Sequence, residues 1–348
     1  MYVYNETGSL TLTITGGRFS NQRTNNAEAG ILLETNGAGA TMDVTITGIL
    51  CDVLEGAACV FAQALDGTMD LVATGNTAQN GGSISNFNNT DGFNLATGDG
   101  TLNFDISDND LQRNRGHGVR LAANFAGTLN GRVTGNDIDG DGPFPPAASA
   151  QPILLLVDGA GPGDPTAYVL IDDNDIDDVV DTTLEMIDIE ARDGVTNLHV
   201  TVTNNRINQD GAATLGNGDH GIEIRSRGIP MVRANVSNNT VDSPDASVNL
   251  DVEDGATMEA TVVSNALSSS GDDELQAETE DAGTSLCLDL RGNKSGVFAL
   301  VETAGTFTME NFASVAGDNS GATIQVGGGI SADGGTCIEP TAPTFPPP

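Results

Sequence analysis

A phrase of about ten residues recurs along most of this chain, with the pattern L-x-[LVF]-x-[IV]-[ST]-[GDN]-N-x-[IL]. Aligned on its asparagine, the phrase covers 276 residues from Gly17 to Asn293 in nine steps, roughly 31 residues per step. Self-similarity at such a period predicts a stack of like units that bury a core only together. The asparagines are Asn76, Asn109, Asn136, Asn174, Asn205, Asn239, Asn265 and Asn293, and Gly17 and Ile49 hold the place in two earlier copies.

Apolar residues alternate within each copy. In the copy centred on Asn205 they are Leu198, Val200, Val202 and Ile207. Period-two alternation predicts a strand with one buried face. Because three residues separate Val202 from the asparagine, the chain must bend there, and the bend turns the asparagine inward. An unpaired buried amide is costly, so we expect the stacked amides to donate hydrogen bonds to one another along the axis.

A second apolar pair, such as Ile187 and Ile189, precedes each asparagine, and no helical periodicity of useful length is visible. The pattern predicts an all-β fold, a parallel β-helix or solenoid, with an Asn ladder at one bend. We expect about 10–11 rungs, a rung being one full turn of the chain around the axis. The expected organisation is one repeat array over residues 1–312, followed by a C-terminal cap or tail over 313–348 that ends in a Pro-rich linker.

The pattern resembles the right-handed parallel β-helix proteins of the pectin-lyase-like superfamily, including their secreted, adhesin-type members. There an Asn ladder likewise occupies a bend between strands. The resemblance covers roughly residues 8–312 and implies a right-handed solenoid. It implies no single activity, because this fold hosts lyases, hydrolases, phage tailspikes and adhesins alike.

Two segments, NNTDGF (88–93) and RGHGV (115–119), resemble motifs of polygalacturonase-type glycoside hydrolases. Those enzymes carry N-T-D, then a D-D pair on the next rung, then G-H-G and R-I-K, and their chemistry requires two carboxylates. The resemblance makes Asp91 and His117 the candidate catalytic residues. Here His117 follows Asp91 by one rung, which leaves no rung for the D-D pair, and no R-I-K follows. We therefore expect no activity of this type at these two residues.

Two acidic clusters are candidate calcium sites. Calcium takes six to eight oxygen ligands, and carboxylates spaced two apart on one strand face supply several of them. Neither cluster matches the EF-hand loop or the calcium β-roll, and the competing interpretation is a solvated acidic surface. The sequence requires no cofactor, and calcium is its one candidate. The residues are Asp137, Asp139 and Asp141 in one cluster and Asp173, Asp175 and Asp177 in the other.

Four cysteines fit no metal or redox spacing. One interpretation is a short-loop disulfide between Cys51 and Cys59 and a second disulfide between Cys287 and Cys337. The latter would tie down the tail, because Cys287 is expected to face outward. The other interpretation is four free thiols. Two disulfides would agree with an extracellular location.

The net charge is −36, with 49 acidic and 13 basic residues. This balance argues against nucleic acid or an anionic membrane as a partner. No stretch reaches the ~18 consecutive apolar residues of a membrane helix, so we expect no membrane insertion. With three Tyr and no Trp, no aromatic platform for stacking on sugars is evident.

The expected function is that of a non-catalytic extracellular or cell-surface module: a structural stalk, an adhesin or a self-assembling fibre segment, with polysaccharide as a candidate ligand. The chain enters a rung by residue 10 without a capping segment before it. Solenoid ends need covering, so we expect end-to-end contact with itself or with neighbouring modules of a longer chain. The alternative is a polysaccharide lyase or glycoside hydrolase of the same superfamily, whose sign would be paired carboxylates facing one groove.

Overall fold

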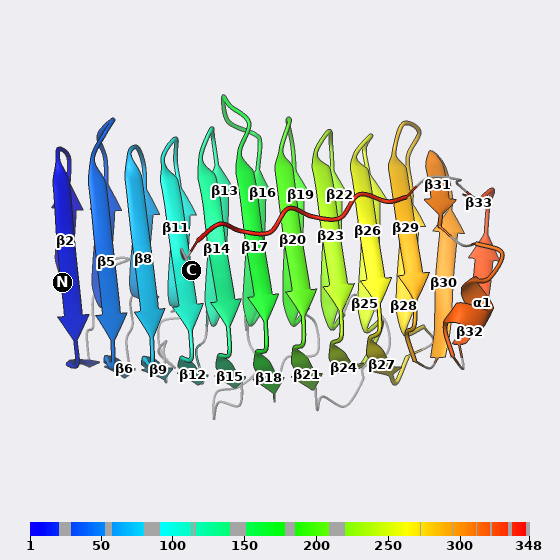
Figure 1. Ribbon diagram of the computed structural model, residues 1–348, viewed down its shortest axis with the longest axis horizontal. Helices are drawn as coiled ribbons and strands as arrows, with labels where there is room; N and C mark the ends of the chain where they lie inside the picture. Colours follow the sequence, from blue (N-terminus) through cyan, green and yellow to red (C-terminus); the bar gives the residue numbers. More distant parts are fainter. Residues whose placement is uncertain are drawn as a thin grey trace, which may run out of the picture.

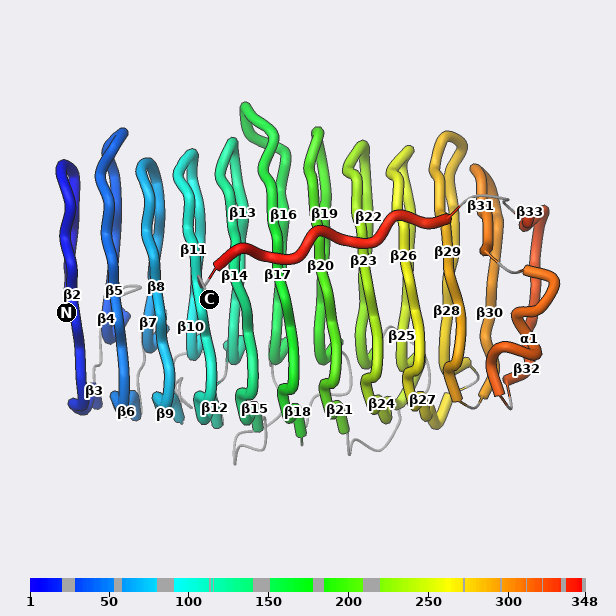
Figure 2. Tube along the Cα trace, in the orientation of Figure 1, coloured from blue at the N-terminus to red at the C-terminus, as the bar shows by residue number. Residues whose placement is uncertain are grey.

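The computed structural model shows an elongated parallel β-solenoid, and the expected all-β fold is confirmed (Figure 1). Among the described residues, three parallel sheets run along its length, with twelve strands in sheet A, twelve in sheet B and nine in sheet C, so about nine rungs carry all three strands, against the expected 10–11. The tube trace shows successive rungs side by side in register (Figure 2). The structure describes residues 1–20, 29–52, 58–79, 91–112, 114, 116–139, 151–177, 185–208, 220–271, 273–294, 296–310, 312–320, 322–332 and 336–345.

Sheet A holds the strands that open each rung. They are β1 (Tyr2–Asn5), β4 (Ile31–Thr35), β7 (Ala58–Ala64), β10 (Asp91–Thr97), β13 (Val119–Asn124), β16 (Ile153–Asp158), β19 (Ile187–Arg192), β22 (Ile222–Arg227), β25 (Val248–Glu253), β28 (Leu275–Thr279), β30 (Gly296–Glu302) and β32 (Ala322–Gly327).

Sheet B holds the strands that carry the repeated phrase. They are β2 (Ser9–Thr15), β5 (Thr41–Thr47), β8 (Thr68–Thr74), β11 (Thr101–Ser107), β14 (Thr128–Thr134), β17 (Thr166–Asp172), β20 (Asn197–Thr203), β23 (Met231–Ser237), β26 (Thr257–Val263), β29 (Ser285–Arg291), β31 (Thr306–Met309) and β33 (Ser331–Ala332).

Sheet C holds short strands that follow the bend. They are β3 (Arg18–Ser20), β6 (Leu50–Asp52), β9 (Thr77–Gln79), β12 (Asp110–Gln112), β15 (Asp137–Asp139), β18 (Asp175–Asp177), β21 (Arg206–Asn208), β24 (Thr240–Ser243) and β27 (Ala266–Ser269).

The alternating apolar residues form the core between the sheets. Leu198, Val200 and Val202 of β20 are fully buried, and Ile207 of β21 is 1% exposed. The residue before each asparagine of the repeated phrase adopts a left-handed backbone, as Asn204 does with φ 56°. This explains the [GDN] position of the phrase, because Gly, Asn and Asp tolerate that conformation best.

The Asn ladder is confirmed. Asn205 accepts hydrogen bonds at its Oδ1 from the backbone N–H and from the Nδ2 of Asn174, at 3.0 and 2.9 Å. Its own Nδ2 donates to Asn239 Oδ1 at 3.0 Å and to the Ile171 carbonyl at 3.0 Å. Each amide thus binds both neighbouring rungs, which removes the cost of burying it.

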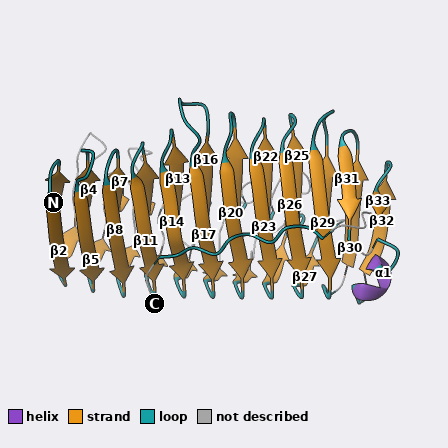
Figure 3. Ribbon diagram, turned by 45° about the horizontal axis from the view of Figure 1, so that its top comes forward, coloured by secondary structure: helices purple, strands orange, loops and turns teal. Residues whose placement is uncertain are grey.

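The ladder runs one rung further than the repeated phrase indicates. Asn293 donates from its Nδ2 to Asn319 Oδ1 at 3.0 Å. Asn319 in turn donates to the carbonyl of Val315, in the short helix α1 (Val315–Asp318), so the helix supplies the acceptor that a further rung would provide. Strands β32 and β33 lie beyond residue 312, so sheets A and B extend past the expected boundary of the array. Figure 3 shows α1 at this end of the solenoid.

Both predicted disulfides are present. Cys51 of β6 bonds to Cys59 of β7, and Cys287 of β29 bonds to Cys337 in the C-terminal segment. The first joins sheet C of one rung to sheet A of the next, and the second holds the tail on sheet B. Within the described part of the chain, no helix is long and apolar enough to cross a membrane.

Candidate functional site

The structure brings the two catalytic candidates together at the start of two neighbouring strands of sheet A. Asp91 Oδ1 lies 3.0 Å from His117 Nδ1 and accepts the His117 backbone N–H at 2.9 Å. Asp91 Oδ2 accepts the side-chain amide of Asn94 at 2.8 Å, and the Asp91 residue is only 6% exposed. Oδ1 thus holds one rung to the next, and Oδ2 is bound by a side chain of its own strand, β10. Asp105 and Asp110, which lie between Asp91 and His117 in sequence, belong to sheets B and C.

The calcium candidates lie mainly on sheet C. The register pairs Asp137 with Asp175 and Asp139 with Asp177 on adjacent rungs. Burial, together with the charges of neighbouring aspartates, raises the pKa of Asp137. Asp173 occupies the left-handed position before ladder residue Asn174, with φ 54°.

The aspartates of β15 and β18 form a row on sheet C, here called the aspartate row. Arg206 of β21 supplies a positive charge beside it. Its Nη1 lies 2.6 Å from Asp175 Oδ1 and 3.3 Å from Asp177 Oδ2. Among the described residues, no group of three or more His, Cys, Asp or Glu side chains is arranged to hold a metal ion. Asp141 lies outside the described residues, so a calcium site here stays a prediction.

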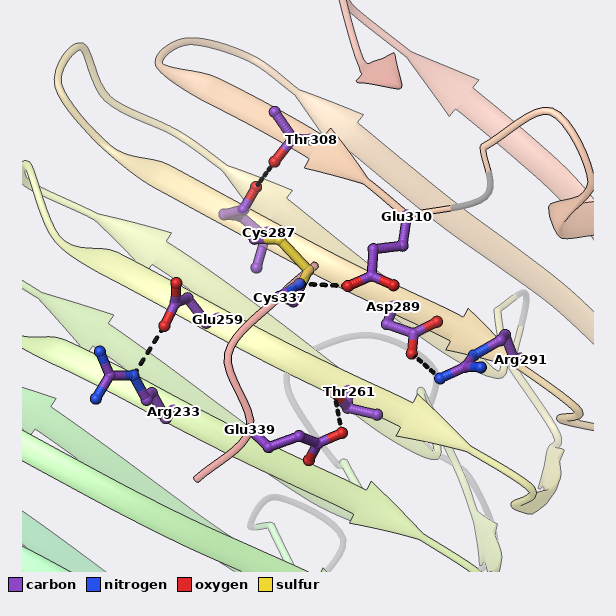
Figure 4. Close-up of a disulfide and its surroundings, with 11 residues drawn as sticks. Arg233, Glu259, Thr261, Cys287, Asp289, Arg291, Thr308, Glu310, Cys337 and Glu339 are labelled. Atoms are coloured by element: carbon purple, nitrogen blue, oxygen red, sulfur yellow. Dashed lines mark hydrogen bonds and ion pairs between the residues drawn. A yellow bond between two sulfur atoms is a disulfide. The ribbon is translucent and has the colours of Figure 1, made fainter. Parts of the chain in front are cut away.

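The outward face of sheet B is crossed by the C-terminal segment, residues 336–345, here called the strap. In Figure 1 it runs back over sheet B from β29 toward β14. The disulfide from Cys337 to Cys287 fixes its start, and the Cys337 backbone N–H donates to Glu310 (Figure 4). Glu339 then accepts hydrogen bonds from Thr261 Oγ1 at 3.1 Å and Asn235 Nδ2 at 2.9 Å.

The far part of the strap is bound as specifically as its start. The Thr341 backbone N–H donates to His199 Nδ1 at 2.9 Å, and the His199 ring stacks on Tyr168 at a centroid distance of 4.9 Å. Asn130 makes two hydrogen bonds to Thr344: its Oδ1 accepts the backbone N–H at 3.0 Å and its Nδ2 donates to the hydroxyl at 3.1 Å. The described part of the tail therefore lies along the flank of its own rungs.

A third feature was missed by the sequence reasoning: a cluster of ionisable side chains on the outward face of sheet A. We call Glu185, Asp188, Glu223, Arg225 and Asp251 the sheet A cluster. Arg225 Nη2 lies 2.5 Å from Glu223 Oε1, and its Nε lies 3.6 Å from Asp251 Oδ2. Asp188 and Glu223 are neighbours in register and are only 8% and 1% exposed.

Burial dominates the electrostatics of this cluster. Together with the charges of Glu185 and Glu223, it raises the pKa of Asp188 to about 7. Burial and the neighbouring Glu253 raise the pKa of Asp251 to about 8. Carboxyl groups with such pKa values exchange protons near neutral pH, and side chains of this kind gather at functional sites more often than elsewhere.

A groove of about 330 Å³ adjoins the cluster on the same face. Asp251, Glu278 and Glu280 line it, and Ala299 and Val301 provide an apolar part of its wall. The sequence held one usable signal, since these acids alternate with apolar residues on the sheet A strands. Their convergence depends on the register between rungs, which no single repeat reveals.

The chain was also compared with known proteins: no family model, no curated protein and no solved structure matches it.

Proposed function

We propose that this chain is a non-catalytic extracellular module of the secreted, adhesin type, a rigid β-helix segment that joins end to end with another solenoid edge. The observation that carries the proposal is the edge formed by β1, β2 and β3, the end strands of the three sheets. The pectin-lyase-like resemblance and the right-handed winding are part of this proposal, and they rest on the repeated phrase.

The backbone of β2 is ready for pairing. The Gly8 carbonyl accepts from Thr41, and the Gly16 N–H donates to Thr47, so the even-numbered residues of this strand bond to β5. In a parallel ladder, alternate residues direct their N–H and C=O to opposite sides. The groups of Thr11 and Thr13 therefore face away from β5, at the edge of the sheet.

A seven-residue edge strand of this kind is a template for another strand. Tyr2 and Tyr4 of β1, the end strand of sheet A, are 60% and 40% exposed. At the opposite end, β33 has only two residues and α1 closes the ladder. This asymmetry supports contact through the N-terminal edge. The two disulfides support an oxidising, extracellular setting.

Thr11→Pro tests the proposal. Proline removes an N–H that makes no bond within the solenoid, and edge positions with a free N–H tolerate it. Light scattering and electron microscopy of the unaltered chain at rising concentration should show dimers or filaments, and Thr11→Pro should remain monomeric. The matched control, Thr11→Ala, keeps the N–H and should associate like the unaltered chain.

Circular dichroism and thermal unfolding should show the same fold in all three proteins. A strictly monomeric unaltered chain at the highest concentration would overturn the proposal. Equal association of Thr11→Pro would show that another surface makes the contact. Release of sugar from polysaccharide by the unaltered chain would favour the alternative function of a lyase or hydrolase.

A further inference from the structure

On the outward face of sheet A, arginine side chains of the protein itself lie between carboxylates of adjacent rungs. Arg225 lies between Glu223 on its own strand and Asp251 on the next. Arg192 Nη2 lies 3.0 Å from Asp158 Oδ2 on the preceding rung, and its Nη1 lies 3.5 Å from Glu190 Oε2 on its own strand. Planar N–H donors held between carboxylates of adjacent rungs are thus a repeated feature of this face.

Three carboxylates on consecutive rungs nonetheless keep an unsatisfied oxygen. Within the described part of the chain, Asp188 Oδ1, Glu223 Oε2 and Asp251 Oδ1 are buried and have no hydrogen-bond partner. Their other oxygens are engaged: Gln151 donates to Asp188 Oδ2 at 3.1 Å, and Asn249 donates to Glu223 Oε1 at 3.0 Å. A buried acceptor without a donor costs about 1–3 kcal/mol, so this arrangement calls for further N–H or O–H donors.

The adjoining groove extends the same chemistry along the solenoid axis. Asp251 and Glu278 are neighbours in register on β25 and β28, at the ~4.8 Å spacing of adjacent strands. Ala299 and Val301 supply apolar wall beside them, and none of the residues that line the groove is basic. Carboxylates repeated at the rung spacing, next to apolar wall, match amines separated by short methylene linkers.

We propose that this face, from Asp188 and Glu223 to Glu278, is a binding site for a linear aliphatic polyamine. Its ammonium groups donate to the free carboxylate oxygens, and its methylenes lie against Ala299 and Val301. A divalent metal fits less well, because no described group of three ligands is arranged to hold one. The proposal goes beyond the end-to-end function, since it concerns a flank of the solenoid and not its edge.

Spermidine is the probe, measured by isothermal titration calorimetry at 0.15 M salt, where distant charges are screened. Asp251→Asn/Glu278→Gln should weaken spermidine binding at least tenfold. The matched control is Asp43→Asn/Asp70→Asn, which removes the same charge from two residues that are also neighbours in register, on sheet B. This control should bind spermidine as the unaltered chain does.

Equal weakening in both double variants would overturn the proposal, because it would show attraction by net charge alone. No binding to the unaltered chain, or calcium binding that depends on Asp251 and Glu278 in place of spermidine, would overturn it as well. Far-ultraviolet circular dichroism of each variant checks that the fold is retained. Spermidine should also raise the unfolding temperature of the unaltered chain and the control, but not that of Asp251→Asn/Glu278→Gln.

Discussion

Removing one amide from the middle of the Asn ladder should destabilise the rungs on both sides of it. The side chain of Asn205 makes five hydrogen bonds, to Asn174, Asn239, Ile171 and Thr203. In Asn205→Ala the backbone N–H of Asn174 loses its acceptor, and the Ile171 carbonyl loses the amide donor. The Asn239 oxygen keeps one partner, because it also accepts the backbone N–H of residue 205.

A buried group that loses its partner costs about 1–3 kcal/mol, and the Asn174 N–H and the Ile171 carbonyl each lose one, so we expect a loss of about 2–6 kcal/mol. Asn205→Asp should distinguish the contribution of the side-chain oxygen, which accepts hydrogen bonds, from that of Nδ2, which donates them. It keeps an oxygen for the Asn174 N–H but sets a second oxygen against Asn239 Oδ1 and the Ile171 carbonyl. It should therefore be less stable, relative to the unaltered chain, at neutral pH than at pH values low enough to protonate the new carboxyl.

Urea unfolding gives the overall loss, and amide hydrogen exchange locates it, because a solenoid can open rung by rung. The exchange of Asn174 and its neighbours should quicken most. Asn204→Gly is the matched control: it removes an exposed amide one residue away and keeps the left-handed backbone at φ 56°. If Asn205→Ala loses no more stability than Asn204→Gly, the ladder does not stabilise the fold as argued.

Two further predictions concern the strap. Cys287→Ser/Cys337→Ser removes a disulfide with a sequence separation of 50. From loop-closure entropy, this should lower the free energy of unfolding by about 4 kcal/mol. Urea unfolding should show this loss. Removing the Cys51–Cys59 disulfide, with its separation of 8, should lower the free energy of unfolding by only about 2.5 kcal/mol. Burial, with the charge of Arg233, lowers the pKa of His199 from 6.5, and protonation would block the bond from Thr341. The stability due to His199 is therefore complete above pH 6.5 and lost as pH falls through the lowered pKa, so the protection of the Thr341 N–H, its exchange rate relative to the intrinsic rate at each pH, should fall on acidification.

The inward-facing half of this structure could be predicted because it repeats. The period-two alternation around Asn205 fixed which residues face the core, and the three-residue step before it predicted the bend. Asn319 escaped notice because α1, not a strand, precedes it. Its signal was nonetheless present, since Asp318 and Asn319 repeat the Asp-Asn pair of two copies of the phrase, Asp108–Asn109 and Asp173–Asn174.

The outward-facing half could not be predicted in the same way. Packing does not constrain these positions to a pattern, so Asp188, Glu223 and Asp251 look like ordinary surface acids in their own repeats. Only the register between rungs brings them together. The path of the strap is a similar case: the pairing of Cys337 could be inferred from an outward Cys287, but the path from there to Asn130 depends on single contacts across distant rungs.

The outward faces of the three sheets differ in how their polar side chains are satisfied by hydrogen bonds and ion pairs. On sheet B the strap satisfies His199 and Asn130, and on sheet C Arg206 pairs with the aspartate row. On sheet A, three carboxylates on consecutive rungs keep a buried free oxygen, and the raised pKa values of Asp188 and Asp251, about 7 and about 8, reflect the free energy that their burial costs. The folded state holds these protons more tightly than the unfolded chain. Stability from this source is thus present at acid pH and lost as pH rises through those values. A module selected for rigidity alone would gain by replacing these carboxylates, so their presence points to ligand binding on sheet A.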